Sequence, residues 1–180
     1  MPPHSPLVLW GRRQVVSALA SLAAASVLPV AAQENQTTVI GQSAPDFKLV
    51  GRDGEPVSLA GYAGKVVYLD FWASWCGPCR QSFPWMNELH DQLRDKGLHV
   101  LAINVDAKHS DAMRFLADTR ASFQVAFDPA GVTPRAYGVR AMPTSFLIDR
   151  KGAIVATHPG FTLARAPASR RDIEQRLGVV

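Results

Sequence analysis

Cysteine is scarce in this sequence, with only two residues in a chain of 180, and long basic runs are missing. Two cysteines exclude a small fold stapled by several disulfides, and they exclude a four-cysteine zinc or iron–sulfur site within one chain. No run of Lys and Arg exceeds two residues despite a formal net charge of +4, which excludes a basic tail that binds nucleic acid. Charged residues make up 19% and hydrophobic residues 47% of the chain, so its composition is that of a globular protein.

The first 32 residues have the composition of an export signal. They contain Arg12 and Arg13, no acidic residue, and an apolar run over 15–32 that ends in small residues. This pattern predicts a cleaved secretory signal peptide. The alternative is an uncleaved membrane anchor through 15–32, because that run is almost long enough to span a bilayer. In both cases we expect a periplasmic or otherwise extracytoplasmic protein with one domain over 33–180.

Strand-like and helix-like segments alternate along 33–180. The expected strands, which are apolar and rich in β-branched or aromatic residues, are 46–50, 56–59, 66–72, 99–105, 124–127, 145–148 and 154–158. The expected helices are 76–96, 110–119, 133–137 and 169–177, with Ser110 and Thr133 as N-caps of the second and third. Alternation that ends in a hairpin predicts an α/β fold with a mixed sheet flanked by helices.

Cys76 and Cys79 stand where the predicted buried strand 66–72 gives way to a predicted helix. The two-residue spacing brings both sulfurs within disulfide distance in the first helical turn. Unpaired amides and the dipole at the helix start favour a thiolate at Cys76. Because the thiolate is the attacking species in disulfide exchange, the pair predicts redox chemistry.

Three other uses of the cysteine pair fit less well. As an inert staple it would close a loop of about four residues, worth ~2 kcal/mol against ~3 kcal/mol for fifteen residues. As half of a zinc site it would need histidines at metal-ligand spacing, and His90, His99 and His109 are far apart in the sequence. As a haem attachment site it would need a histidine directly after Cys79, where Arg80 stands.

The segment Phe71-Trp72-Ala73-Ser74-Trp75-Cys76-Gly77-Pro78-Cys79 resembles the active-site segment of thioredoxins. The rest of 33–180 is similar to the exported TlpA/ResA/CcmG branch of that superfamily. The matching motifs are Ala44-Pro45-Asp46-Phe47, Gly64-Lys65, Phe83-Pro84, Pro143-Thr144 and Phe146-Leu147-Ile148-Asp149, together with an inserted helix and strand between Asp106 and Pro134. The resemblance implies a thioredoxin fold with an N-terminal β-hairpin extension and thiol–disulfide oxidoreductase activity without a cofactor or metal.

The same resemblance assigns roles to individual residues. Cys76 would be the exposed nucleophile, and Cys79 the buried thiol that resolves the mixed disulfide with a substrate. Gly77 and Pro78 form the dipeptide between them that thioredoxins share. Trp72 and Trp75 would shield the sulfurs and pack rather than do chemistry. Trp75, Gly77 and Pro78 would also belong to the active-site loop that binds the substrate, together with Met142 and Pro143. Pro143 matches the family's cis-proline, which helps hold an incoming substrate, and Met142 would either contact the sulfurs or serve only in packing.

Asp70 is a carboxylate inside the apolar run 66–72. A buried carboxylate must find a partner or take up a proton, because an unpaired buried charge is very costly. One interpretation places Asp70 at an exposed strand end. The other makes it the proton acceptor for Cys79, as in cytoplasmic thioredoxins. The exported branch often has Asn there and a Glu three residues after the second cysteine, where this chain has Ser82.

Three functions are compatible with these residues. The first is a reductase of specific disulfides in apocytochrome c or in copper-site cysteines, recharged by a membrane thiol donor. The second is a disulfide oxidant or isomerase, although oxidising members usually have His where this chain has Pro78. The third is a dithiol protein that passes on copper. We expect protein substrates that carry disulfides, no nucleic-acid partner, and a monomer.

Overall fold

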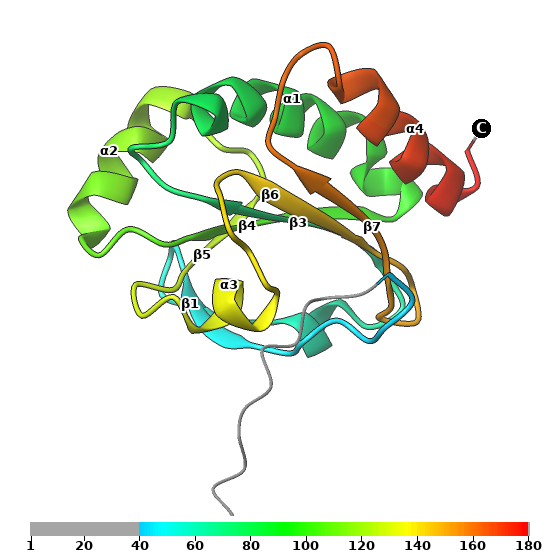
Figure 1. The fold of residues 1–180 in the computed structure, drawn as a ribbon, viewed down its shortest axis with the longest axis horizontal. Helices are drawn as coiled ribbons and strands as arrows, with labels where there is room; N and C mark the ends of the chain where they lie inside the picture. The colour runs from blue at the N-terminus through cyan, green and yellow to red at the C-terminus, as the bar shows by residue number, and fades with distance from the viewer. Residues whose placement is uncertain (1–39, 180) are drawn as a thin grey trace, which may run out of the picture. The chain divides into compact units, whose positions relative to one another are not determined.

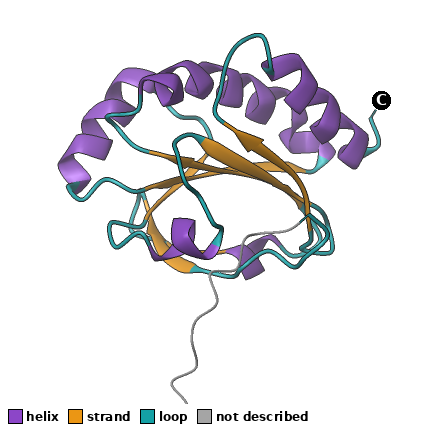
Figure 2. Cartoon of the chain, in the orientation of Figure 1, coloured by secondary structure: helices purple, strands orange, loops and turns teal. Residues whose placement is uncertain are grey.

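The computed structural model describes residues 40–179, in which one sheet has helices on both faces (Figure 1, Figure 2). Its strands are β1 (Lys48–Gly51), β2 (Pro56–Ser58), β3 (Val66–Trp72), β4 (Leu98–Asn104), β5 (Gln124–Phe127), β6 (Thr144–Ile148) and β7 (Ile154–Pro159). Its helices are α1 (Gly77–Leu93), α2 (His109–Thr119), α3 (Val132–Ala136) and α4 (Ala166–Leu177), with 3-10 turns η1 (Leu59–Tyr62) and η2 (Arg94–Lys96). Within 40–179, no helix combines the length and apolarity needed to cross a membrane. The predicted signal segment 1–32 lies outside the described residues.

The strands follow the order β2-β1-β5-β4-β3-β6-β7 across the sheet. β3, β4 and β5 run parallel, β6 is antiparallel to β3, and β7 is antiparallel to β6. The β1–β2 hairpin joins the other edge antiparallel to β5. Helices α1, α2 and α4 cover one face and α3 lies on the other (Figure 1). The predicted mixed α/β fold, with its N-terminal hairpin and its inserted α2–β5 unit, is confirmed.

The central strand β3 separates two hydrophobic cores. All seven of its residues are buried, as expected for a strand covered on both faces. Because side chains alternate along a strand, Tyr68 and Trp72 enter the core beneath α1, whereas Leu69 and Phe71 enter the core on the opposite face. Asp70 shares the parity of Tyr68 and Trp72, so its carboxyl group is directed to the α1 face.

Helix α1 begins directly after Cys76, which is its N-cap residue. Pro78 occupies the first turn, where the missing amide hydrogen costs nothing because it would have no helical partner. The buried side of the helix carries Phe83 and Leu89, and Pro84 lies on its exposed side. Gly97, with a left-handed φ of 98°, ends the following 3-10 turn, close to the predicted end of the helix.

Two predicted N-caps are wrong. Helix α2 begins one residue earlier than expected, at His109, and Ser110 lies inside it. Thr133 lies inside α3, and the backbone amide of Thr133 donates to a carboxylate oxygen of Asp128 at 2.6 Å. Asp128 therefore satisfies a free backbone amide at the start of α3 from five residues upstream. The polar side chain directly before the helical pattern did not identify the residue that caps this helix.

The last helix also begins earlier than the sequence pattern predicted. Helix α4 starts at Ala166, three residues before the expected start at Ser169, and Pro167 lies in its first turn. Proline at the start of a helix is a recognised signal, because its fixed φ suits the first turn. The preceding loop leaves the sheet at the end of β7, where the amide of Gly160 donates to the carbonyl of Pro143 at 2.7 Å.

Candidate active site

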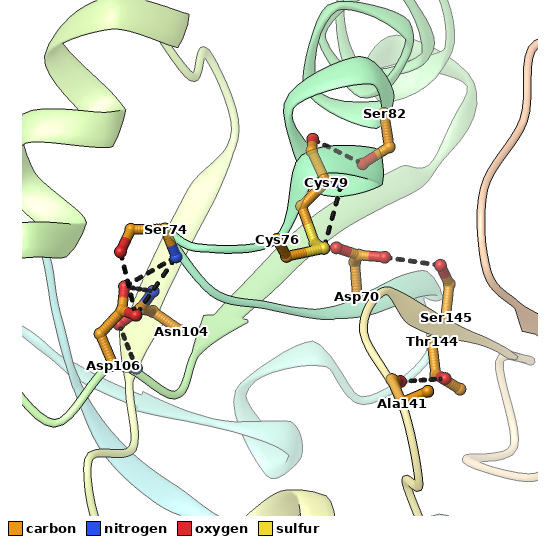
Figure 3. The surroundings of a disulfide bond; sticks show 10 residues. All are labelled: Asp70, Ser74, Cys76, Cys79, Ser82, Asn104, Asp106, Ala141, Thr144 and Ser145. Carbon is orange, nitrogen blue, oxygen red and sulfur yellow. Dashed lines mark hydrogen bonds between the residues drawn. A yellow bond between two sulfur atoms is a disulfide. The ribbon is translucent and has the colours of Figure 1, made fainter.

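The cysteine pair lies at the carboxyl end of β3, where the chain enters α1. Cys76 and Cys79 form a disulfide with their Cα atoms 5.3 Å apart. Cys79 is fully buried and Cys76 is 5% exposed. The backbone amide of Cys79 donates to the sulfur of Cys76 at 3.2 Å (Figure 3). In the reduced protein the same amide and the helix dipole would stabilise a thiolate at Cys76 rather than at Cys79.

Asp70 is buried beside the disulfide, which excludes the interpretation that placed it at an exposed strand end. Its side chain is directed toward the sulfurs in Figure 3, and the residue is 1% exposed. The hydroxyl of Ser145 donates to its Oδ1 at 2.6 Å, whereas Oδ2 is buried with no partner among residues 40–179. Burial raises the pKa of Asp70 to about 7, although the hydrogen bond from Ser145 opposes the shift. Asp70 can therefore gain and lose a proton near neutral pH.

The residue that takes the place of the exported branch's glutamate cannot share this task. Ser82 is buried, and its hydroxyl donates to the carbonyl of Cys79 at 3.0 Å within α1. A serine hydroxyl bound to the helix backbone does not ionise near neutral pH. The carboxyl group that faces the disulfide is thus that of Asp70, on the strand rather than on the helix.

Pro143 lies at the same end of the sheet as the cysteines. Thr144 pairs with Phe71, so Pro143 continues β6 past the last paired residue of β3, toward the loop that carries Cys76. The Met142–Pro143 peptide bond is cis. The hydroxyl of Thr144 donates to the carbonyl of Ala141 at 2.8 Å across this turn (Figure 3). Met142 is partly buried and packs against both hydrophobic cores.

The two tryptophans of the motif lie in different environments. Trp72 is fully buried, with its ring centroid 4.9 Å from that of Phe83 and 4.7 Å from that of Phe115. Trp75 is 72% exposed, so the expectation that it packs like Trp72 is wrong. The reason is position: Trp75 lies in the turn that follows the sheet, and Trp72 already occupies the core beneath α1. Trp75 instead offers an apolar surface beside Cys76.

A polar network that the sequence reading missed holds the loop before Cys76. The buried carboxylate of Asp106 accepts from the backbone amide of Ser74 at 2.9 Å and from its hydroxyl at 3.1 Å. It also accepts from the side-chain amide of Asn104 at 2.8 Å (Figure 3). The sequence contained a signal for this network. Asn104 and Asp106 are polar residues at the end of a buried strand, and parallel strands end at the same edge of the sheet, so these side chains could be expected near the loop that follows β3.

The geometry defines a class of protein: a thioredoxin fold with a Cys-Gly-Pro-Cys disulfide at a helix start. The family model described as Redoxin matches residues 40–176. The thiol-disulfide oxidoreductase ResA of Geobacillus thermodenitrificans is 34% identical over 144 residues, which cover 80% of this chain and 79% of that protein.

Two solved structures are also similar. A putative thiol:disulfide interchange protein DsbE from Chlorobium tepidum is 56% identical with a TM-score of 0.76, covering 78% of this chain and 99% of that one. The pneumococcal exposed lipoprotein thioredoxin from Streptococcus pneumoniae is 35% identical with a TM-score of 0.63, covering 72% and 99%. The chain belongs to the Redoxin family and is a thioredoxin-like thiol–disulfide oxidoreductase.

Proposed function

We propose that this protein is an extracytoplasmic reductase that donates two electrons from Cys76 and Cys79 to specific protein disulfides. The observation that carries the proposal is Asp70, a buried carboxyl group beside Cys79. One of its oxygens has no partner among residues 40–179, and its pKa is about 7. A resolving thiol in a dry site needs such a proton acceptor at neutral pH. The Gly77-Pro78 dipeptide agrees with this direction, because thioredoxin itself is a reductant near about −270 mV.

The reaction proceeds in two exchanges. The thiolate of Cys76 attacks one sulfur of the substrate disulfide, and a mixed disulfide forms as the other substrate sulfur leaves as a thiolate. Asp70 then takes the proton of Cys79, and the resulting thiolate attacks Cys76. This step closes the Cys76–Cys79 disulfide and releases the second substrate thiolate. Two electrons pass to the substrate, and each released thiolate takes its proton from water or from the protein.

The substrate surface surrounds the sulfur of Cys76. Trp75 offers an exposed indole on one side, and Met142 and the cis-proline Pro143 lie at the same end of the sheet. An extended substrate segment placed along Pro143 would bring its disulfide to Cys76, the more exposed of the two cysteines. Apocytochrome c and the cysteines of copper sites are the substrate classes we favour, on the similarity to the TlpA/ResA/CcmG branch.

The location and the electron supply form part of the same proposal. The pattern of residues 1–32 and the similarity to an exposed lipoprotein thioredoxin support a periplasmic or otherwise extracytoplasmic site of action. There the protein would be recharged by a membrane thiol donor and would act as a monomer. Within 40–179 no group of three or more His, Cys, Asp or Glu side chains is arranged for a metal ion.

Trapping experiments test the assignment of the two cysteines. The Cys79→Ser variant should accumulate a mixed disulfide between Cys76 and an oxidised apocytochrome c fragment, visible on a non-reducing gel. The Cys76→Ser variant should trap none, because Cys79 is fully buried. Equal trapping by the two variants would refute the proposed roles. The same trapping is done with an oxidised copper-site protein. If Cys79→Ser traps neither this protein nor the apocytochrome c fragment, the proposed substrates are refuted. The roles of the two cysteines can then still be tested with a small disulfide.

A further inference from the structure

The turn that carries Cys76 out of the sheet is held by hydrogen bonds at two points within residues 40–179. The first lies inside the turn 73–76, where the backbone amide of Cys76 donates to the carbonyl of Ala73 at 3.1 Å. The second lies at Ser74, whose backbone amide and hydroxyl both donate to the carboxyl group of Asp106, at 2.9 and 3.1 Å (Figure 3). The attachment of this turn to the rest of the protein therefore depends on Asp106.

Asp106 is itself fixed to the sheet. It is 6% exposed, the side-chain amide of Asn104 donates to its Oδ2 at 2.8 Å, and its backbone amide donates to Oδ1 of Asn104 at 3.0 Å. Asn104 ends β4 and pairs with Trp72 at the end of β3, and its carbonyl accepts from the amide of Asp128 after β5 at 2.8 Å. The carboxyl group of Asp106 is thus a fixed point built on the ends of three neighbouring strands.

The turn in its own right places the sulfur of Cys76. Cys76 is the N-cap residue of α1, with φ −88° and ψ 107°, and its sulfur accepts from the backbone amide of Cys79 at 3.2 Å. An N-cap side chain reaches the first amides of a helix only while its own backbone keeps this extended conformation. The stabilisation of a thiolate by these amides and by the helix dipole falls off within the first turn. A small movement of the turn would therefore lower the amount of thiolate at Cys76.

We propose that Asp106 is a positioning residue for the nucleophile, because through Ser74 it holds the sulfur of Cys76 at the first amides of α1. This role rests on the proposed function, in which Cys76 is the attacking cysteine. No hydrogen bond joins Asp106 to either sulfur within 40–179, so it acts through the turn and not on the reacting atoms. Asp106 serves attack by Cys76, whereas Asp70 serves the later resolution step.

Positioning and charge predict opposite effects of Asp106 on Cys76. A negative charge disfavours a nearby thiolate, so Asp106→Asn would increase the thiolate at Cys76 if Asp106 acted through charge alone. Positioning predicts a decrease, because one donor of Ser74 loses its acceptor and the sulfur is held less well at the helix amides. Ser74→Ala removes the hydroxyl donor without any change of charge, and positioning predicts a decrease there too.

Alkylation of the reduced full-length protein by iodoacetamide over a pH series measures this thiolate. Cys79 is fully buried, so mass analysis of the labelled peptides should place the label on Cys76. Ser74→Ala should slow alkylation at pH 7 about threefold, the size expected for the loss of one hydrogen bond. Asp106→Asn should slow it as well. At a pH where Cys76 is ionised in every variant, the rates should converge on that of the wild type.

Ser122→Ala is the matched control. The backbone amide and hydroxyl of Ser122 both donate to the side-chain oxygen of Asn87, at 2.8 and 3.0 Å, in the turn before β5 at the opposite end of the sheet. Removal of this hydroxyl should leave the pH–rate profile of Cys76 unchanged. Ser74→Thr keeps a hydroxyl for Asp106 and should retain most of the wild-type rate. Partial unfolding would expose Cys76 and speed alkylation at every pH, so it would not imitate the expected result.

The outcomes separate positioning from the role of Cys76. If Ser74→Ala and Asp106→Asn react more slowly at pH 7 and match the wild type at high pH, positioning is supported. It is overturned, and the role of Cys76 stands, if Asp106→Asn reacts as fast as the wild type or faster. The same holds if Ser74→Ala matches Ser122→Ala, or if the variants stay slow when Cys76 is fully ionised. If the label in the wild type appears on Cys79 instead, the proposed nucleophile and its positioning residue both fall.

Discussion

Two buried aspartates flank the redox loop, and their surroundings differ sharply (Figure 3). The carboxylate of Asp106 accepts hydrogen bonds from the backbone and side chain of Ser74 and from the side chain of Asn104. Asp70 receives one hydrogen bond, from Ser145, and its other oxygen is buried without a partner among the described residues. The hydrogen bonds of Asp106 fix the loop before Cys76, whereas the burial of Asp70 penalises its charged form and keeps a proton available.

The comparison gives its largest expected effect in the pH dependence of stability. In the oxidised native protein Asp70 keeps its proton up to a pKa of about 7, whereas in the unfolded chain it ionises near 3.8. The unfolded state therefore binds fewer protons within this window, and the contribution of Asp70 to stability falls as pH rises from 3.8 to about 7. The loss is on the order of 4 kcal/mol and is complete above that range.

Urea unfolding of the wild type and of Asp70→Asn across this pH range measures the effect. The variant should gain stability relative to the wild type as pH rises, and the difference should level off above neutral pH. A difference that is constant with pH would contradict a protonated, buried Asp70.

The next effect is on the rate of mixed-disulfide resolution. Asp70→Asn removes the proton acceptor for Cys79 and should slow this step about a hundredfold, the lower range for general acid–base catalysis. In the wild type the rate should rise with pH as Asp70 ionises near pH 7, and the variant should lose this inflection. Stopped-flow measurements over a pH series check both statements. An identical pH–rate profile in the variant would make Asp70 a structural residue.

Asp106 should show the opposite behaviour. In Asp106→Asn an amide nitrogen replaces one of the two oxygens that accept from the backbone amide and the hydroxyl of Ser74, so one of these donors loses its acceptor. The free energy of unfolding should fall by about 2 kcal/mol. The resolution step should keep its inflection with pH, because the carboxyl group of Asp70 is untouched. Denaturant unfolding and the same stopped-flow series provide the two measurements. If Asp106→Asn loses the inflection, Asp106 also takes part in the proton transfer, and its role is not limited to holding the loop.

The smallest effect on the fold is expected at Trp75. Because its side chain is 72% exposed, Trp75→Ala should change the free energy of unfolding by less than about 0.5 kcal/mol. It should slow the reduction of a protein disulfide several times more than that of glutathione disulfide, since only the larger substrate can contact the indole. Equal slowing of the two reactions would mean that Trp75 acts on the chemistry of Cys76 rather than on docking.

Local patterns predicted the parts of the site that lie within one segment of chain. The buried run of β3, the helix start at Cys76 and the cysteine spacing are short-range features, and the structure places each of them as expected. The partners of the aspartates could not be predicted in this way. Ser145 lies 75 residues beyond Asp70, and Asp106 lies 32 residues beyond Ser74, so both contacts depend on strand register.

Helix starts were the weaker part of the sequence prediction for a related reason. The residue that satisfies the amide of Thr133 is Asp128, across a turn. At the start of α4 the carbonyl of Thr162 accepts from the amides of Arg165 and Ala166. Trp75 is likewise exposed because Trp72 fills the core beneath α1. The motif contains both tryptophans, and its sequence alone does not show which of them is buried.

The reduction potential of the Cys76–Cys79 pair tests the central claim most directly. Equilibration of the protein with thiol–disulfide buffers, followed by alkylation and mass analysis, gives this value. A reductase of protein disulfides predicts a potential below about −240 mV, close to that of thioredoxin. A potential above about −180 mV would place the protein among disulfide oxidants and isomerases and would contradict the account.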